Sequence, residues 1–422
     1  MTLAPPLPDT RQPEALLAHV RSVLDFYDPR AIDPTGGCYQ FFKDDGTVYD
    51  RCRRHLVSST RYVFLWAMAS RHLGEPRYLD HARHALRFLR DGHRQPAGNY
   101  LWELDWDEGR ASTIDDTQHC YGLAFVLLAY AHAVMAGLDE ARPWLAETFE
   151  RLDALFWQPE FGAYADEATV AGLVAPYRGQ NANMHLVEAC LAAHEATGEA
   201  RYLDRAATVA ETIVMRLSVR AASDPGASSG ADTDVGWIWE HYKADWTIDW
   251  HYNEGDASNL FRPWGYQPGH FTEWAHLLLT LEQRRPQPWH LPRARELFDA
   301  ALRHGWDEVH GGLVYGFGPG GKVCFADKYH WVQCETIAAA AMLGARTGEA
   351  SYWQSYDRLW AYAWRHWVDH DHGAWYRILA PDNSKLTDEK SPAGKVDYHT
   401  TGACWRAIAA LRSLDRDRRD PA

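Results

Sequence analysis

The chain has few of the features that mark a secreted, membrane or nucleic-acid-binding protein. Its seven cysteines are odd in number and show no C-x-x-C spacing, which argues against a disulfide framework and a zinc site. No apolar run approaches the length of a membrane span. The first eight residues show neither the basic nor the apolar region of a signal peptide. We therefore expect a cytoplasmic protein without disulfides.

A surplus of positive charge is also missing. With 43 Lys and Arg against 57 Asp and Glu, the 422-residue chain has a net charge of −14. Nucleic acids and anionic membranes both reward a basic face, so neither is expected as a partner. Aromatic residues, in contrast, are abundant, with 20 Trp and 21 Tyr. Such rings are typical of carbohydrate sites, because the apolar face of a sugar stacks on them.

A helical repeat runs through the chain. The segments 74–80, 198–204 and 348–354 share the pattern Gly-Glu-x-x-Tyr, and each joins an Ala-rich apolar stretch to another helical pattern. Apolar periodicity predicts twelve helices, at approximately 11–27, 57–72, 75–91, 116–136, 140–157, 183–197, 199–218, 268–283, 290–305, 329–347, 349–367 and 398–414.

The predicted helices fall into two kinds. Alternate helices are apolar nearly all round, whereas their partners carry charged residues on one face, which indicates an inner and an outer ring. We therefore expect an all-α protein, an (α/α)6 barrel with short β-hairpins in its connecting loops, forming a single catalytic domain over residues 1–422. The Ser- and Gly-rich stretch 221–233 is expected to be a loop.

Polar residues interrupt the apolar pattern at the starts of the inner helices. The outer-to-inner connections of such a barrel meet at one end, so these residues are expected to converge on one mouth. Three histidines from three hairpins, His185, His270 and His399, are the leading candidates. Each alone could equally be a satisfied core or capping residue, but three in equivalent positions favour chemistry. Glu273 shares a helix face with His270. The wider set is Arg61, Asp115, Asp116, His119, Asn181, Asn183, Arg262, Lys328, Trp331, Gln333, Glu335 and Asp397.

The three histidines and Glu273 could together bind a metal ion. The chain has no H-E-x-x-H motif, and ligands from three separate hairpins would need a preformed site. We therefore predict no metal and no other cofactor.

Four motifs in order resemble those of the N-acylglucosamine 2-epimerase superfamily. They are QNANMH (180–185), WGYQPGH (264–270) with Glu273, KYHWVQCE (328–335) and Tyr398-His399, and the resemblance, which covers nearly the whole chain, is greatest to the aldose–ketose isomerase branch. It implies a metal-free (α/α)6 barrel with His270 and His399 as the acid/base pair and with His185, Glu273 and Arg61 completing the catalytic group. The sugar contacts expected with it are Asn181, Arg262, Trp331, His119 and Gln333.

The activity implied by the resemblance is interconversion of D-mannose and D-fructose. It requires removal of the C2 proton, a cis-enediol intermediate and reprotonation at C1, and histidine can both accept and donate protons near neutral pH. Many epimerases of the superfamily have a second Trp where this chain has His330, which weakens an assignment to the disaccharide or N-acetyl-sugar enzymes. The expected partner is a small monosaccharide, and the oligomeric state is left open.

Three other functions stay open. A sugar 2-epimerase of the mannose/glucose, N-acylglucosamine or cellobiose type would use the same intermediate and return the proton to the opposite face of C2. A glycoside hydrolase on this fold would need two carboxylates, for which Glu103, Asp105, Asp107 and Glu273 are candidates. A non-catalytic sugar-binding protein would bind mannose without exchanging its C2 hydrogen.

Overall fold

The computed structural model describes residues 5–219, 226, 236–256, 259 and 262–419. In this part of the chain there are twelve α-helices, so the predicted (α/α)6 architecture is confirmed. They are α1 (Pro13–Tyr27), α2 (Leu56–Leu73), α3 (Pro76–Phe88), α4 (Cys120–Met135), α5 (Arg142–Phe156), α6 (Gln180–Thr197), α7 (Ala200–Glu211), α8 (Pro268–Arg284), α9 (His290–Gly305), α10 (His330–Thr347), α11 (Ala350–His366) and α12 (Tyr398–Arg419).

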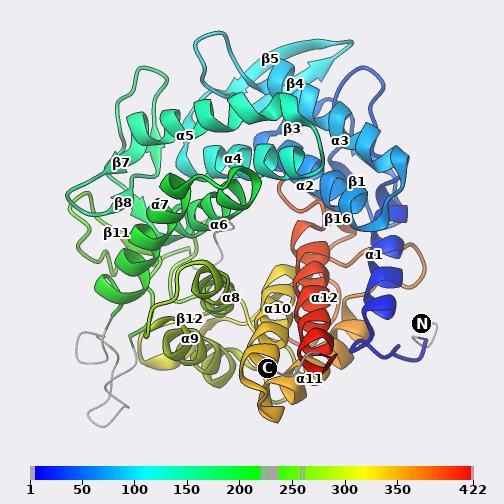
Figure 1. Cartoon of the computed structure of the whole chain (residues 1–422), viewed down its shortest axis with the longest axis vertical. Helices are drawn as coiled ribbons and strands as arrows, with labels where there is room; N and C mark the ends of the chain where they lie inside the picture. The colour runs from blue at the N-terminus through cyan, green and yellow to red at the C-terminus, as the bar shows by residue number, and fades with distance from the viewer. Residues whose placement is uncertain (1–4, 220–225, 227–235, 257–258, 260–261, 420–422) are drawn as a thin grey trace.

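The helices form two concentric rings (Figure 1). The even-numbered helices make the inner ring, in which α2, α4, α6, α8, α10 and α12 each pack on the next and α12 returns to α2. The odd-numbered helices lie outside, and α1 packs on α12. The first helix of the chain therefore lies beside the last and closes the barrel.

The sequence of each helix explains its ring. Nearly every residue of α4 is buried, because inner helices contact neighbours on all sides. In α3 only Tyr78, Ala82, Ala85, Leu86 and Phe88 are buried, a single stripe that faces the inner ring. The repeated turns end α2, α6 and α10 with glycines at φ of 70°, 75° and 73°, a left-handed conformation that suits glycine.

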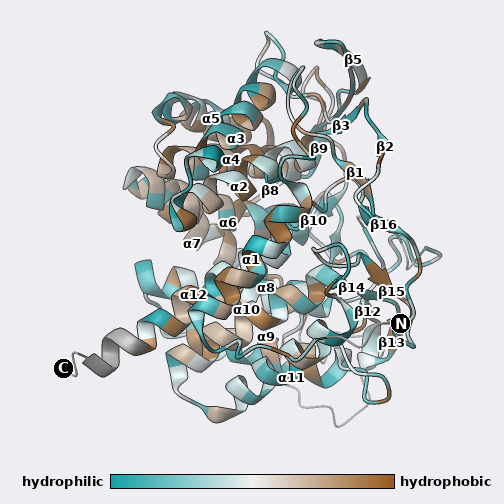
Figure 2. Ribbon diagram, turned by 90° about the vertical axis from the view of Figure 1, so that its right-hand side faces the viewer, coloured by the Kyte–Doolittle hydropathy of each residue, from teal (hydrophilic) through white to brown (hydrophobic). Residues whose placement is uncertain are grey.

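Short strands gather at one end of the barrel. Figure 2 shows most of them on one side of the molecule, with the C-terminal end of α12 on the opposite side. The strands are β1 (Phe41–Lys43), β2 (Val48–Asp50), β3 (Arg53–His55), β4 (Glu103–Asp107), β5 (Arg110–Asp115), β6 (Gln118–His119), β7 (Trp157–Gln158), β8 (Ala163–Tyr164), β9 (Glu167–Ala168), β10 (Arg178–Gly179), β11 (His241–Tyr242), β12 (Gly316–Phe317), β13 (Val323–Phe325), β14 (Lys328–Tyr329), β15 (Ile378–Leu379) and β16 (Glu389–Ser391).

These strands pair antiparallel and fix the entry to several inner helices. β6 pairs with β9 before α4, β10 with β11 before α6, and β14 with β15 before α10. Two larger sheets have the orders β16-β1-β2 and β3-β4-β5. The expectation of short β-strands in the loops therefore holds.

Some helix boundaries differ from the predicted ones. α4 begins at Cys120 rather than at residue 116, because Gln118 and His119 pair with β9. α6 begins at Gln180, three residues before the predicted 183. α3 and α7 pass into π-helical turns at Leu89–His93 and Thr212–Arg216. Apart from residue 226, the stretch 221–233 lies outside the described residues.

No helix in the described part of the chain combines the length and apolarity needed to cross a membrane. All seven cysteines are free thiols, and five of them are buried.

Candidate active site

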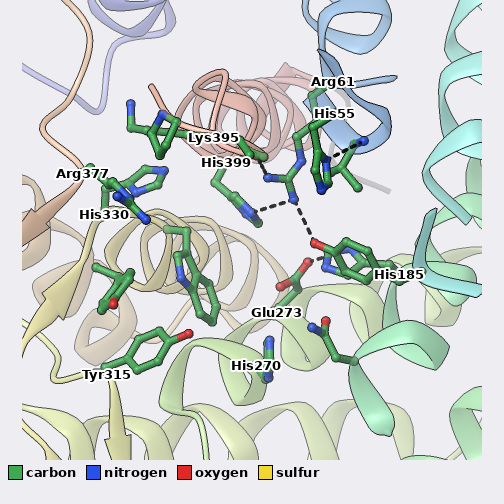
Figure 3. Close-up of a pocket in the computed structure, with 18 of the residues that line it drawn as sticks. His55, Arg61, His185, His270, Glu273, Tyr315, His330, Arg377, Lys395 and His399 are labelled. Carbon is green, nitrogen blue, oxygen red and sulfur yellow. Dashed lines mark hydrogen bonds and ion pairs between the residues drawn. The ribbon is translucent and has the colours of Figure 1, made fainter. Parts of the chain in front are cut away.

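A pocket lies at the N-terminal ends of the inner helices (Figure 3). All six inner helices contribute a side chain to it, as the repeat predicts. Its lining residues are His55, Val57, Arg61, Tyr121, Asn181, His185, Pro263, His270, Glu273, Tyr315, Tyr329, His330, Trp331, Arg377, Pro392, Ala393, Gly394, Lys395 and His399. Seven predicted site residues therefore share one cavity, namely Arg61, Asn181, His185, His270, Glu273, Trp331 and His399.

His399 has a defined tautomer. Its Nδ1 lies 2.6 Å from Oε1 of Glu335, and its Nε2 lies 3.3 Å from a guanidinium nitrogen of Arg61. Glu335 as a carboxylate can only accept and Arg61 can only donate, so Nδ1 carries the proton and Nε2 presents a lone pair. Burial lowers the pKa of His399 to about 4, although the hydrogen bond to Glu335 opposes this shift. At neutral pH His399 is therefore a neutral imidazole with a basic nitrogen at the pocket.

His270 is held in a similar way by a different carboxylate. Its Nδ1 lies 2.9 Å from Oε1 of Glu240 and 2.9 Å from the amide nitrogen of Gln180. The indole of Trp274 donates to the amide oxygen of Gln180 at 2.8 Å, which fixes the amide so that its nitrogen faces Glu240 and His270. Nδ1 is thus engaged by both Glu240 and Gln180, which leaves Nε2 as the nitrogen available to a ligand.

Trp331 packs against both histidines. Its ring centroid is 5.1 Å from that of His270 and 5.8 Å from that of His399, and both pairs are tilted. Figure 3 shows His270 and His399 on different sides of the same space. Such a group of rings suits a sugar. The C–H face of the sugar can stack on the indole, and the two imidazoles can exchange protons with its carbon and oxygen atoms.

A second group of polar side chains forms another wall of the pocket. His185 Nδ1 lies 3.3 Å from Glu188 and 3.6 Å from Glu273. Burial, followed by the neighbouring Glu335 and Glu188 carboxylates, raises the pKa of Glu273 well above its usual value. This shift favours the protonated form of Glu273, whose Oε2 has no hydrogen-bond partner among the described residues. It can donate a hydrogen bond to a ligand oxygen.

Arg61 supplies the positive charge nearest to His399. Its guanidinium donates to the carbonyl of Gly394 and lies 4.6 Å from the ring centroids of both Phe125 and Tyr398. The aromatic rings and the carbonyl hold the guanidinium in place. A cation fixed in this way can stabilise negative charge that develops on a bound oxygen.

Three predicted sugar contacts lie outside the pocket lining. Arg262 pairs with Glu167. His119 packs against Trp102 with ring centroids 4.0 Å apart, and its Nδ1 is 3.2 Å from Glu167.

Gln333 is the third of these residues and is buried against a loop. Its amide accepts from Leu313 N and donates to Leu313 O at 2.9 and 2.8 Å. Asn183 makes the same pair of bonds to Tyr164, and Gln118 makes it to Tyr100. In the repeats of α4, α6 and α10 an amide side chain thus holds the preceding loop, and Gln333 makes this structural contact.

Sequence reasoning missed several residues that shape the site. The sequence gives no signal for Glu240, and it places Glu335 only in the wider set of polar residues. His276, bonded to Glu335, had a visible signal, because it follows His270 and Glu273 at the same three-residue spacing. Arg377 and Lys395 also line the pocket; they come from loops, where periodicity gives no information.

Possible metal ligands come close together in two groups. Ligand atoms of His185, Glu188 and Glu273, and those of Glu273, Glu335 and His399, lie within 4.8 Å of one another. In the first group His185 pairs with Glu188 and Glu273, and in the second His399 pairs with Glu335.

Comparison with known proteins identifies the family. Residues 36–403 match the model of the N-acylglucosamine 2-epimerase (GlcNAc 2-epimerase) family. The chain belongs to this family. A D-mannose isomerase from Marinomonas mediterranea is 47% identical over 397 residues, covering 94% of this chain and 97% of the relative. One from Thermobifida fusca is 37% identical over 372 residues, covering 86% of each chain. A crystal structure of D-mannose isomerase, at 47% identity, matches with a TM-score of 0.90 over 95% of this chain and 99% of its own.

The carboxylates that the sequence offers for glycoside hydrolysis do not form a pair in the pocket. Glu273 is the sole carboxylate among the described pocket-lining residues. Glu103 and Asp105 lie on β4 beside Arg53 instead. The pair of carboxylates that glycoside hydrolysis requires is therefore absent from the described lining.

Proposed function

We propose that the protein is an aldose–ketose isomerase that interconverts D-mannose and D-fructose without a metal. The observation that carries this proposal is the pair of histidines that pack against Trp331 in one pocket. Each has its Nδ1 held by a carboxylate and its Nε2 available at the same pocket. The identity to D-mannose isomerases supports the same substrate, and seven free thiols fit a reducing, cytoplasmic location.

The geometry gives each group a task. After the sugar ring opens, the Nε2 lone pair of one histidine takes the C2 proton while O1 gains a proton, and the electrons of the C2–H bond form the C1=C2 bond of the cis-enediol. The other histidine, protonated on Nε2, delivers a proton to C1 while the hydroxyl on C2 loses its own, so that the carbonyl moves from C1 to C2 with no net oxidation. Arg61 and protonated Glu273 face the oxygen atoms on which negative charge develops. Asn181 and Trp331 hold the carbon chain of the open sugar in position.

The charge of the pocket supports a neutral sugar. Lys395 lies 2.5 Å from Asp397, and Arg377 lies 2.9 Å from Glu389. Each of these two cations already has a carboxylate partner, so a phosphate or sulfonate on the substrate would have to displace it. Arg61, which makes no such ion pair among the described residues, stands next to His399 at the reacting end.

The direct test is to incubate the purified protein with D-mannose and separate the products. We expect D-fructose, with solvent deuterium at C1 when the reaction runs in deuterated water. D-glucose as the main product would favour the 2-epimerase instead. Mannose binding with no product and no exchange of its C2 hydrogen would contradict both enzymes.

A further inference from the structure

Besides His270, helix α8 carries a second histidine, which lies outside the pocket lining. His276 is fully buried and is separate from the pocket lining. Its Nε2 lies 2.6 Å from Oε2 of Glu335, whose Oε1 lies 2.6 Å from Nδ1 of His399. His276, Glu335 and His399 therefore form one continuous chain across α8, α10 and α12, which we call the histidine–glutamate relay.

The direction of both hydrogen bonds follows from the chemistry of the groups. A carboxylate can only accept, so His276 donates from Nε2 as His399 donates from Nδ1. Although burial alone would raise it, these two hydrogen bonds hold the pKa of Glu335 well below its usual value. The other nitrogen of His276 is buried without a hydrogen-bond partner among the described residues. An unpaired buried nitrogen is unfavourable, so the contribution of His276 is its bond to Glu335.

We propose that His276 is a positioning residue that keeps His399 a neutral base. Two N–H donors share the negative charge of Glu335, which weakens the hold of this carboxylate on a proton. With one donor removed, the Glu335–His399 pair takes up a proton at higher pH. Once the pair is protonated on the imidazole, or on the Glu335 oxygen that faces Nδ1 of His399, it has no lone pair facing the pocket.

Other charged groups surround the relay and stay constant in the comparison below. Arg406 of α12 and Glu188 of α6 act on His276. Glu273 of α8 acts on Glu335. Arg61 of α2, His185 of α6 and His330 of α10 act on His399. Because none of these groups is changed in the variants, a shift in the titration of His399 can be attributed to the loss of the N–H donor of His276.

The kinetic test compares three variants. His276→Phe removes the donor and keeps a ring, whereas His276→Gln places an amide N–H near the position of Nε2. His290→Phe is the matched control, because His290 is also buried, its Nδ1 has no hydrogen-bond partner among the described residues, and it makes no hydrogen bond to the relay. We expect the acidic limb of kcat/KM to move up by about one pH unit in His276→Phe. It should return toward the wild-type position in His276→Gln and stay unchanged in His290→Phe.

This inference rests on the proposed function for its kinetic arm only. Histidine-labelled protein titrated by NMR, with His399 assigned from the His399→Asn spectrum, measures the same shift without any turnover. If the wild type forms no ketose, the proposed function fails while the NMR titration still tests the relay. An unmoved His399 titration in His276→Phe, or an equal shift in His276→Gln or His290→Phe, would overturn the inference. His276→Met, which also lacks a donor, repeats the test if the Phe variant does not fold.

Discussion

The two pocket histidines differ in their carboxylate partners and in the charged groups near them. His270 has Glu240 to itself, with Gln180 bridging the pair, whereas His399 shares Glu335 with His276 and faces Arg61. A shared carboxylate and an adjacent cation both disfavour the imidazolium form of His399. The two residues are thus prepared for different parts of the proton transfer, with His399 resting as a base.

Replacing either histidine with Asn should remove a proton-handling group and retain the fold. We expect turnover on D-mannose to fall by on the order of 10²–10⁴ for His270→Asn and for His399→Asn. Because the two act on one intermediate, the double variant should be little worse than the poorer single variant. His290→Asn serves as a distant control. Near wild-type turnover in folded His270→Asn and His399→Asn would make Glu273 the first candidate for the base.

At the scale of elements, the same clasp recurs at the entrances of α4, α6 and α10. An amide side chain holds both backbone groups of a residue in the preceding loop, from Gln118, Asn183 and Gln333 in turn. The clasp fixes the loop against the helix, which sets where the neighbouring pocket residues Tyr121, Asn181 and Trp331 lie.

Removing one clasp should affect stability rather than sugar binding. Gln333→Leu leaves the N–H and C=O of Leu313 unpaired in a fully buried place. We expect the free energy of unfolding to fall by about 1–3 kcal/mol, with KM for D-mannose close to that of the wild type. Chemical unfolding and initial-rate kinetics measure the two quantities. A large rise in KM at unchanged stability would restore Gln333 as a sugar contact.

Helices were predictable from the sequence because their apolar pattern is local. α9 (His290–Gly305) matches its predicted span, and α8 and α10 differ from theirs by one residue. The missed boundaries depend on distant pairing, as in β6 with β9 before α4. The same limit applies to the site. The position of His270 at a helix start was visible, but its partner Glu240 comes from a loop thirty residues away in the chain.

At the scale of the whole molecule, the barrel closes through buried polar contacts as well as apolar ones. Tyr27 of α1 donates to Asp397 at 2.7 Å, and Lys395 pairs with the same carboxylate. Asp397 directly precedes α12, which carries His399. The first helix of the chain therefore supports the segment that presents the last catalytic candidate.

Metal removal should leave activity intact, because histidine, arginine and a protonated glutamate suffice for the proposed proton transfers. We expect turnover on D-mannose to be unchanged after prolonged dialysis against EDTA, with the residual metal content checked by mass spectrometry. Loss of activity that returns on adding a divalent cation would contradict the metal-free mechanism.

Acid should destabilise the protein through its buried histidines. Burial lowers the pKa of His19, His93 and His399 to about 4, and that of His55 and His132 to about 3. In the unfolded chain the same groups titrate near pH 6.5, so below that pH the unfolded state binds more protons than the folded state. The free energy of unfolding then falls as pH falls, by up to about 1.4 kcal/mol per pH unit for each histidine.

Carboxyl groups with a raised pKa act in the opposite direction. Burial raises the pKa of Asp166 to about 7 and that of Glu273 well above its usual value, which offsets part of the loss from the five histidines. We expect Tm to change little between pH 7 and 8.5 and to fall steadily between about pH 6.5 and 4.5. His132→Phe should flatten this dependence, because it removes one such histidine, whose Nδ1 has no hydrogen-bond partner among the described residues. His251→Gln should not, since the side chain of His251 is 82% exposed. A Tm that stays constant or rises from pH 7 to 5 would contradict the view that these histidines are buried in their neutral form.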